Sequence, residues 1–264
     1  MTAAPNEPVL LRRDDGPVAI LTLNRPHAMN ALSGDLIDSL QVQFDKLAGE
    51  KEIRCVIIEA RGRAFSTGHD LREVASSRDH AFHHDLLSRC SAMMLAIHRL
   101  PQPVIAKVHA MATAAGCQLV AACDLAVASS EATFATSGIT NGLFCGTPSV
   151  PVGRTVGAKR ALDMLFTGQF VDAATALRDG LVSRVAAPDK LDAETLALAH
   201  HIAAQPPQQI ASGKAMFHAH MEMNLEQAYT FATDFMAAAI LSEDAKAGID
   251  AFVNKKPKPE WKGK

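Results

Sequence analysis

The sequence predicts an α/β fold in which buried strands alternate with helices through much of the chain. Short, continuously apolar runs stand at 55–58 and at Val104–Val108, as expected of strands that are buried on both faces. Apolar residues with helical spacing lie between these runs. Hydrophobic residues make up 48% of the 264 residues, which is enough to bury a sizeable core and argues against disorder.

The first elements lie near the N-terminus. Val18–Leu23 alternates apolar and polar side chains and leads into the turn Asn24-Arg25-Pro26, which indicates a strand with a sharp exit. A helix follows, and Ser33 is suited to cap it. The buried strand at 55–58 then leads into a loop over 61–70. The helix is predicted from apolar residues that recur every three to four positions: Leu36, Ile37, Leu40, Phe44 and Leu47.

The same alternation then repeats, with a helix over about 81–100, the strand Val104–Val108, a small-residue helix over about 115–123 and a strand at 125–128. From about residue 152 onward helix signals dominate. Asp172 caps a short helix that stops at Gly180, and amphipathic runs cover about 189–204, 208–223 and 225–253. No repeat or low-complexity linker divides the chain, so we expect the last helices to pack on the core or on a neighbouring subunit.

Charge and cysteine usage narrow the functional class. The 26 basic and 28 acidic residues nearly cancel, which argues against a nucleic-acid or membrane partner. The five cysteines form no CxxC pair and no zinc-ligand spacing, as in an intracellular protein with reduced core thiols. Residues 1–8 lack the pattern of a signal peptide, and no apolar stretch reaches the ~20 residues of a membrane span. We therefore expect a cytoplasmic location by default, with a cleaved organelle presequence as the alternative.

Two stretches are suited to a close approach between the backbone and a ligand. Residues 64–71 follow a buried strand and carry small side chains before a helix start at Asp70. Residues 112–118 open a helix with a second run of small side chains. The first backbone N–H groups of a helix are unpaired and stabilise an anion. Two such donors that converge would form an oxyanion hole, although the same pattern is also typical of tight helix packing.

Short motifs run through the chain in a fixed order. They are Asn24-Arg25-Pro26 with Asn30-Ala31-Leu32, residues 64–70, residues 115–119 with Cys123-Asp124, residues 165–168, residues 176–182, and Ala251-Phe252 with Lys255-Lys256-Pro257. This collinear set resembles the enoyl-CoA hydratase/isomerase family, also called the crotonase family. The stretch 142–148 is similar in particular to divergent members called enoyl-CoA hydratase domain-containing proteins.

The resemblance implies an α/β, crotonase-like spiral of ββα turns with a C-terminal helical trimerisation region. Residues 1–200 would form the spiral core, and residues 201–264 would complete the coenzyme A site and the trimer interface. The implied partner is an acyl-CoA thioester, and the implied assembly is a homotrimer or a dimer of trimers. Coenzyme A would enter as part of the substrate or ligand, with no cofactor bound permanently.

The resemblance also implies roles for individual residues. The thioester carbonyl would accept hydrogen bonds from the backbone N–H groups of His69 and Ala115, with Gly116 beside the second donor. A lysine near the C-terminus would meet a phosphate, whereas the other lysines there are typical of a solvated tail. The implied coenzyme A contacts are Arg25, His27, Ala28, Ala64, Phe65, Arg72 and Lys255.

Two positions depart from the family pattern. Hydratases use two glutamates to deliver water and a proton, and the resemblance maps those positions onto Gln118 and Gly138. An amide cannot take a proton from water near neutral pH, and glycine has no side chain. An acid or base contributes on the order of 10²–10⁴ in rate, so losing both outweighs the 10²–10³ or so that an oxyanion hole supplies. A register shift would bring Ser137 or Thr140 there, and neither is a carboxylate.

Other polar residues have simpler interpretations. Glu131 stands in a polar turn, which indicates a solvated side chain. The imidazole of His69 could titrate near neutrality, although the residue can also act through its N–H alone. Asn141, Cys145 and Thr147 fall where other family chemistries place polar groups. A cluster of three histidines lacks the carboxylate of a metal site, so we expect no metal there: His80, His83 and His84.

Three functional hypotheses follow. The first is an acyl-CoA enzyme of the lyase or isomerase type, in fatty acid metabolism, whose reaction differs from standard hydration. The second is a non-catalytic acyl-CoA binder or scaffold that has lost the acid–base pair. The third is an RNA-binding role, known for some relatives, which the balanced charge disfavours.

Overall fold

A six-stranded sheet lies at the centre of the computed structural model, which describes residues 7–264. Its first two strands pair in an antiparallel hairpin, and the other strands pair in parallel. In spatial order the strands are β1 (Leu10–Asp15), β2 (Val18–Leu23), β3 (Cys55–Ala60), β5 (Val104–Val108), β7 (Leu125–Ser129) and β10 (Arg184–Ala186). The apolar runs in the sequence form β3 and β5, because these strands are covered on both faces.

A second, four-stranded sheet is built from much shorter strands in the order β4 (Ala64–Ser66), β6 (Met111–Thr113), β8 (Thr133–Ala135) and β9 (Val171–Asp172). β4, β6 and β8 follow directly after strands of the large sheet, and each leads toward a helical segment. The chain therefore winds through successive turns of strand, short strand and helix. This confirms the predicted α/β spiral of ββα turns.

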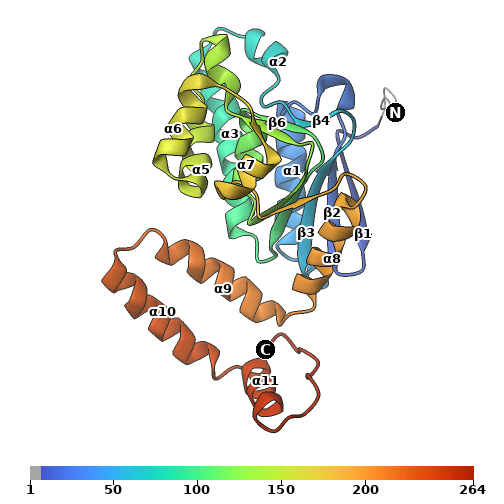
Figure 1. The fold of residues 1–264 in the computed structure, drawn as a ribbon, viewed down its shortest axis with the longest axis vertical. Helices are drawn as coiled ribbons and strands as arrows, with labels where there is room; N and C mark the ends of the chain where they lie inside the picture. The colour runs from blue at the N-terminus through green and yellow to red at the C-terminus, as the bar shows by residue number, and fades with distance from the viewer. Residues whose placement is uncertain (1–6) are drawn as a thin grey trace.

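Helices cover both faces of the large sheet (Figure 1). On one face lie α1 (Gly34–Leu47), α3 (His80–Arg99) and α4 (Ala115–Ala122), whose buried side chains form the main core. The other face carries α8 (Leu191–Ala203), which covers a second core cluster. The predicted cap Ser33 accepts a hydrogen bond from Leu36 N, at 3.4 Å. The predicted helices of this layer are thus present with only small shifts at their ends.

Shorter helices complete the body. They are α2 (Leu71–Ala75), α5 (Gly146–Val156), α6 (Ala158–Thr167) and α7 (Ala173–Arg178), with 3₁₀ turns η1 (Pro26–Ala28) and η2 (Ser137–Asn141). Asp172 caps α7 as predicted, because its carboxylate accepts a hydrogen bond from Thr175 N at 2.8 Å. No helix within residues 7–264 is both long and apolar enough to cross a membrane.

The last helices project from the body as a C-terminal arm, residues 207–264 (Figure 1). The arm comprises α9 (Pro207–His220), α10 (Leu225–Ala239) and α11 (Glu243–Val253). Lys214 of α9 ties the arm to the body, since its Nζ donates to Ile97 O at 2.7 Å and to Asp124 Oδ2 at 2.6 Å. The boundary predicted at residue 200 falls inside α8.

The single helical run predicted over 225–253 is wrong. The structure divides it into α10 and α11. Ser242 starts the second helix, because its Oγ accepts a hydrogen bond from Ala245 N at 3.1 Å and so favours a new N-terminus at this point. The amphipathic period continues through this break, so periodicity alone did not reveal it.

Candidate functional site

The first predicted donor, His69, lies in a loop whose direction is fixed by one bridge to Leu32. Leu32 N donates to Gly68 O at 2.7 Å, and Asp70 N donates to Leu32 O at 3.3 Å. In a parallel bridge of this kind, the residue between the two bonded neighbours points its own N–H to the other side. The His69 N–H therefore faces away from Leu32.

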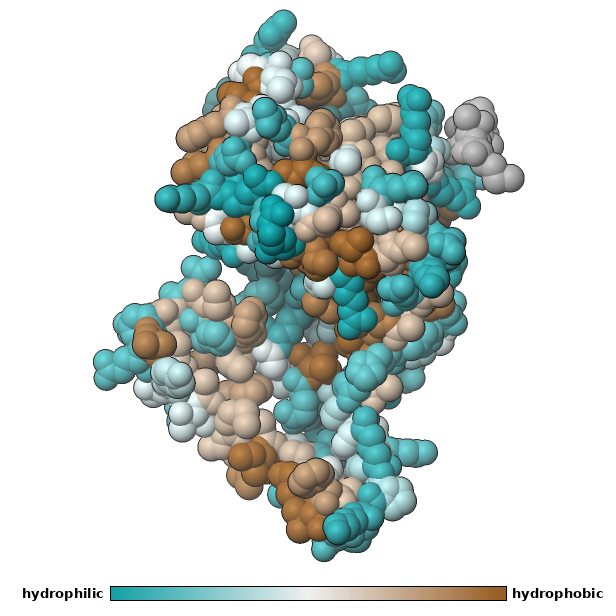
Figure 2. Space-filling view, in the orientation of Figure 1, coloured by the Kyte–Doolittle hydropathy of each residue, from teal (hydrophilic) through white to brown (hydrophobic). Residues whose placement is uncertain are grey.

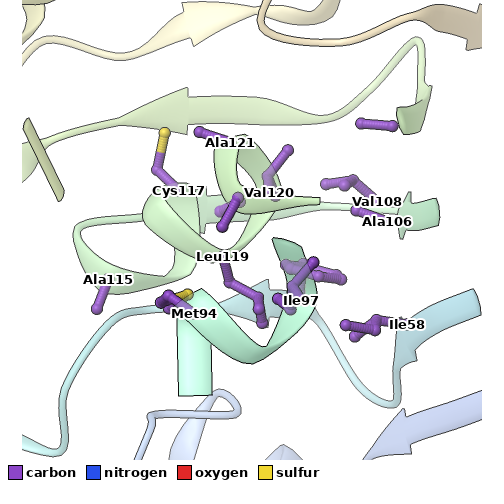
Figure 3. Close-up of a cluster of buried hydrophobic side chains, with 14 of the residues drawn as sticks. Ile58, Met94, Ile97, Ala106, Val108, Ala115, Cys117, Leu119, Val120 and Ala121 are labelled. Atoms are coloured by element: carbon purple, nitrogen blue, oxygen red, sulfur yellow. The ribbon is translucent and has the colours of Figure 1, made fainter. Parts of the chain in front are cut away.

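The second predicted donor, Ala115, is the first residue of α4. Ala114 precedes it with φ 51°, a left-handed conformation that costs about 1–3 kcal/mol in a residue other than glycine. The Ala114 N–H donates to Ala135 O at 3.0 Å, which holds this conformation in place. Every residue of α4 is buried, and Figure 3 shows Leu119 directed toward Met94 and Ile97 of α3. The N-terminus of α4 is therefore rigidly positioned.

Two glycines allow the loops that carry these donors to touch. A Cβ on Gly68 would lie 3.0 Å from Ala115 N and 2.8 Å from Ala114 Cβ. A Cβ on Gly116 would lie only 2.2 Å from Ser66 O. Only glycine allows this approach, which brings the His69 loop against the start of α4.

The structure thus places the loop that carries His69 against Ala115 and Gly116 at the start of α4. Among residues 7–264, the N–H groups of His69 and Ala115 donate no hydrogen bond. Unpaired N–H groups at the start of a helix attract a partial negative charge, and the helix dipole adds to that effect. The arrangement can accept an oxygen that develops negative charge.

Gln118 lies one turn into α4 and is only 3% exposed. Its Oε1 is buried and has no hydrogen-bond partner within the described chain. An unpaired buried amide oxygen is costly, so a water molecule or a ligand donor is its natural partner. Thr136 Oγ1, just before η2, is in the same condition.

Gly138 lies in η2 with little space around its Cα. A Cβ there would stand 2.6 Å from Leu143 O and 2.7 Å from Cys145 Sγ. Its N–H donates to that sulfur at 3.2 Å. The neighbouring Ser137 turns instead toward β6, where its Oγ lies 2.7 Å from Thr113 Oγ1. The sulfur of Cys145 therefore fills the space that a side chain at position 138 would enter.

The His69 imidazole is largely buried, and both of its ring nitrogens lack a hydrogen-bond partner within residues 7–264. Burial lowers the pKa of His69, while the Leu32 carbonyl and Glu73 act in the opposite direction. The imidazole is therefore neutral at neutral pH, and it can accept or donate a hydrogen bond without adding charge.

The residues predicted to contact coenzyme A lie in different environments. His27 and Arg72 are exposed and Ala28 is half-buried, so these side chains remain accessible. Ala64 and Phe65 are fully buried, so only their backbone can reach a ligand. Both lie on β4, directly before the His69 loop.

Two further residues predicted to contact coenzyme A, Arg25 and Lys255, are less available to it within one chain. The Arg25 guanidinium donates to Ala31 O at 2.6 Å and to Asp70 Oδ2 at 2.9 Å, so these contacts compete with any phosphate. Lys255 is exposed at the end of α11, and Figure 1 shows α11 at the end of the molecule opposite β4 and α2. Within one chain, Lys255 does not join the other predicted contacts.

Neighbouring polar residues add little to the chemistry of the site. Glu131 is exposed in its turn. His80 and His84 stack on α3 with ring centroids 6.1 Å apart. Across residues 7–264, no three His, Cys, Asp or Glu residues are grouped so that they could hold a metal ion.

Sequence reasoning missed the residues that support the two loops. Asn30 is fully buried, and its Nδ2 donates to Arg61 O at 2.7 Å and to Ala64 O at 2.8 Å. Its Oδ1 accepts a hydrogen bond from Arg25 N at 2.9 Å. The only sequence signal for this role was an asparagine and an arginine within a tight turn.

Comparison with known proteins identifies the family. The family model described as "Enoyl-CoA hydratase/isomerase" matches residues 13–264. Human enoyl-CoA hydratase domain-containing protein 3, mitochondrial, is 40% identical over 254 residues, which cover 96% of this chain and 83% of that protein. The mouse protein of the same name is 41% identical over 250 residues, which cover 95% of this chain and 83% of that protein.

Solved structures agree as well. A crystal structure of an enoyl-CoA hydratase from Mycobacterium smegmatis superposes with a TM-score of 0.94 at 48% identity, covering 96% of this chain and 99% of that one. The crystal structure of human enoyl-CoA hydratase domain-containing protein 3 gives a TM-score of 0.92 at 38% identity, covering 95% and 99%.

The cytoplasmic location expected from the sequence is contradicted by these relatives. The mouse, rat and human proteins of this comparison are all named mitochondrial. The prediction depended on the start of the chain, and residues 1–6 lie outside the part that the structure describes.

The spiral topology is therefore that of solved structures that match nearly the whole chain. The family model and the superposed crystal structures cover both the body and the arm. The chain belongs to the enoyl-CoA hydratase/isomerase family, the crotonase family.

Proposed function

We propose that the protein binds an acyl-CoA thioester, with the thioester carbonyl oxygen between the N–H groups of His69 and Ala115. One observation carries this proposal: within residues 7–264, both N–H groups are unpartnered, and glycines allow the His69 loop and the start of α4 to lie in contact. Such donors stabilise an oxygen on which negative charge develops. Coenzyme A would enter as part of this ligand.

We further propose that the bound thioester does not undergo standard two-carboxylate hydration. At the first glutamate position, the open Oε1 of Gln118 can accept a hydrogen bond from water but cannot remove its proton near neutral pH. At the second, Gly138 has no side chain, and Cys145 Sγ occupies the adjoining space. The site therefore combines carbonyl recognition with weak acid–base chemistry.

Cys145 is a poor replacement for the second carboxylate. Burial raises the pKa of its thiol, and the hydrogen bond from Gly138 N only partly opposes that effect. The thiol form therefore dominates at neutral pH, and it is neither a strong base nor a strong nucleophile. This supports a binder, or an enzyme with a different acyl-CoA reaction, over a hydratase.

The arm supports a proposed assembly into trimers or dimers of trimers. Apolar side chains remain exposed along α10, α11 and the link between them, and Figure 2 shows apolar surface at the lower end of the arm. Exposed apolar area of this kind is typical of an interface. In such an assembly, Lys255 would complete a coenzyme A site on a neighbouring subunit. The residues concerned are Leu225, Tyr229, Met236, Leu241, Phe252 and Val253.

Ligand-dependent thermal unfolding tests the binding proposal. A ligand at 100 times its Kd stabilises the folded protein by about 2.7 kcal/mol, which raises Tm on the order of 5 °C. We expect butyryl-CoA to raise Tm more than S-butyl-CoA, a thioether that keeps the chain but lacks the carbonyl. Equal shifts for the two ligands would contradict a role for the paired donors, and no shift for either would contradict acyl-CoA binding.

The variant Gln118→Glu tests the second part. It restores one carboxylate at a buried position whose amide oxygen has no hydrogen-bond partner within residues 7–264. We therefore expect measurable hydration of crotonyl-CoA above the wild-type rate. The second position is harder to restore, because Gly138→Glu would push its Cβ against Leu143 O. Gln118→Glu that folds and binds butyryl-CoA, yet adds no hydration, would count against the role assigned to this position.

A further inference from the structure

An ion pair between Arg25 and Asp70 links the turn after β2 to the residue that follows the first donor, His69. Arg25 lies in the turn after β2, and Asp70 follows His69 directly. The guanidinium Nη2 donates to Asp70 Oδ2 at 2.9 Å, and the two side chains are only 15% and 16% exposed. The pair is therefore shielded from most of the screening that weakens surface ion pairs.

Both partners make further contacts with the backbone around His69. Arg25 Nη1 donates to Ala31 O at 2.6 Å, next to the residue that bridges to His69. Asp70 Oδ1 accepts a hydrogen bond from Arg72 N at 3.1 Å and caps α2. One ion pair thus connects the segment before the bridge with the residue after the donor.

The charge state of Asp70 fits this role. Burial acts to raise the pKa of Asp70, but hydrogen bonds from Arg25 and from the Arg72 N–H outweigh it, so the pKa lies below its ordinary value. The carboxylate therefore stays ionised across the neutral range, and the ion pair persists.

We infer that Arg25 and Asp70 are positioning residues that fix the direction of the His69 N–H toward the thioester oxygen. The inference rests on the proposed function, because it concerns the same carbonyl site. The Leu32 bridge holds the residues on either side of His69, and the ion pair prevents the Asp70 end from rotating. Arg25 then acts on the acyl group through the donor and not through a coenzyme A phosphate.

Two substitutions separate this role from simple structural support. Asp70→Asn removes the charge, while asparagine caps a helix about as well as aspartate does. Arg25→Lys keeps a positive charge, but one ammonium group does not reproduce the planar fork that bonds Ala31 O and Asp70 together. A matched control is Glu50→Gln, which likewise removes the charge of a carboxylate paired with an arginine, here Arg12 (Nη1 to Oε1, 2.9 Å). Glu50 follows the C-terminal end of α1, away from the Leu32 bridge at its N-terminal end.

The readout is the absorbance of bound cinnamoyl-CoA, whose conjugated thioester absorbs at longer wavelength when its carbonyl is polarised. We expect a red shift with the wild type and with Glu50→Gln, and a clearly smaller shift with Asp70→Asn and Arg25→Lys. The affinity ratio of cinnamoyl-CoA to free CoA should fall about 10-fold in these two variants, as one well-aligned hydrogen bond weakens. Affinity for free CoA should stay unchanged.

The outcomes distinguish this inference from the proposed function. If the wild type binds cinnamoyl-CoA without a red shift, the proposed carbonyl site is wrong. If the wild type shows the shift and folded Asp70→Asn keeps all of it, the positioning role is wrong. A loss of affinity for free CoA equal to that for cinnamoyl-CoA would also overturn it, because it would make Arg25 a coenzyme A contact. Should Asp70→Asn fail to fold, Arg25→Lys decides by the same criteria.

Discussion

The contact between Gly116 and Ser66 offers the sharpest structural perturbation of the candidate site. In Gly116→Ala, the new Cβ would start 2.2 Å from Ser66 O and 2.7 Å from Ser66 C. Ordinary contact needs more than 3 Å, so the first loop and α4 must separate by about 1 Å. Ser66 is fully buried and its Oγ donates to Asn30 O at 2.9 Å, which leaves it little freedom to retreat.

Two magnitudes follow from this displacement. Overpacking of a buried site costs about 1–3 kcal/mol of folding free energy. The two donors also lose their alignment, and at about 1 kcal/mol for each hydrogen bond the thioester affinity falls about 30-fold. The thioether S-butyl-CoA has no carbonyl to lose, so its affinity should change little.

The assay measures Kd for butyryl-CoA and for S-butyl-CoA by calorimetry, together with urea unfolding. Gly153→Ala in α5 is the matched control, because its Cβ would meet Ala161 Cβ at an ordinary 3.9 Å. The control should keep the wild-type preference for the thioester. A Gly116→Ala variant with wild-type stability and undiminished thioester preference would show that the contact between Gly116 and Ser66 does not align the two donors.

Three further predictions concern the framework around the site. Asn30→Ala removes three hydrogen bonds of a fully buried side chain, so the free energy of unfolding in urea should fall by about 3 kcal/mol; a loss below ~1 kcal/mol would contradict this account. Lys214→Met leaves the buried Asp124 carboxylate without its ammonium partner, so the free energy of unfolding in urea should fall by about 3–5 kcal/mol. An unchanged urea midpoint would argue against a role of this ion pair in holding α9 on the body. Burial and the neighbouring His218 lower the pKa of His98 below 6.5, so the unfolded chain takes up this proton first and stability falls as pH drops below 6.5. His98→Gln should reduce that pH dependence, measured by urea unfolding between about pH 7 and pH 5, while the buried His69 keeps a part of it. A slope equal to that of the wild type would exclude His98 as a source.

The sequence predicts the long elements well because their burial leaves a clear pattern. β2 and β5 lie at the predicted positions, and Ser33 caps α1 as expected. The strands β4, β6 and β8 were missed because each has only three residues, too few to show a periodicity. Their position was visible only indirectly, as small residues before helix starts.

The candidate site was predictable in its backbone and not in its side-chain support. The small residues around Gly68 and Gly116 signal a close approach in sequence as in structure. The ion pair of Arg25 with Asp70 joins residues 45 positions apart, and sequence spacing does not reveal such a contact. Likewise, the sequence gives no sign that Cys145 Sγ fills the space beside Gly138.

The most direct test of the central claim is the hydration of crotonyl-CoA by the wild-type protein at high concentration. Loss of the conjugated thioester absorbance reports hydration, and a glutamate-bearing hydratase of the family serves as the positive control. We expect crotonyl-CoA to bind and raise Tm, while its absorbance decays at least about 10²-fold more slowly than with the control. Turnover at the rate of the control would contradict the proposed loss of hydration, because another group would then supply the acid–base chemistry that Gln118 and Gly138 lack.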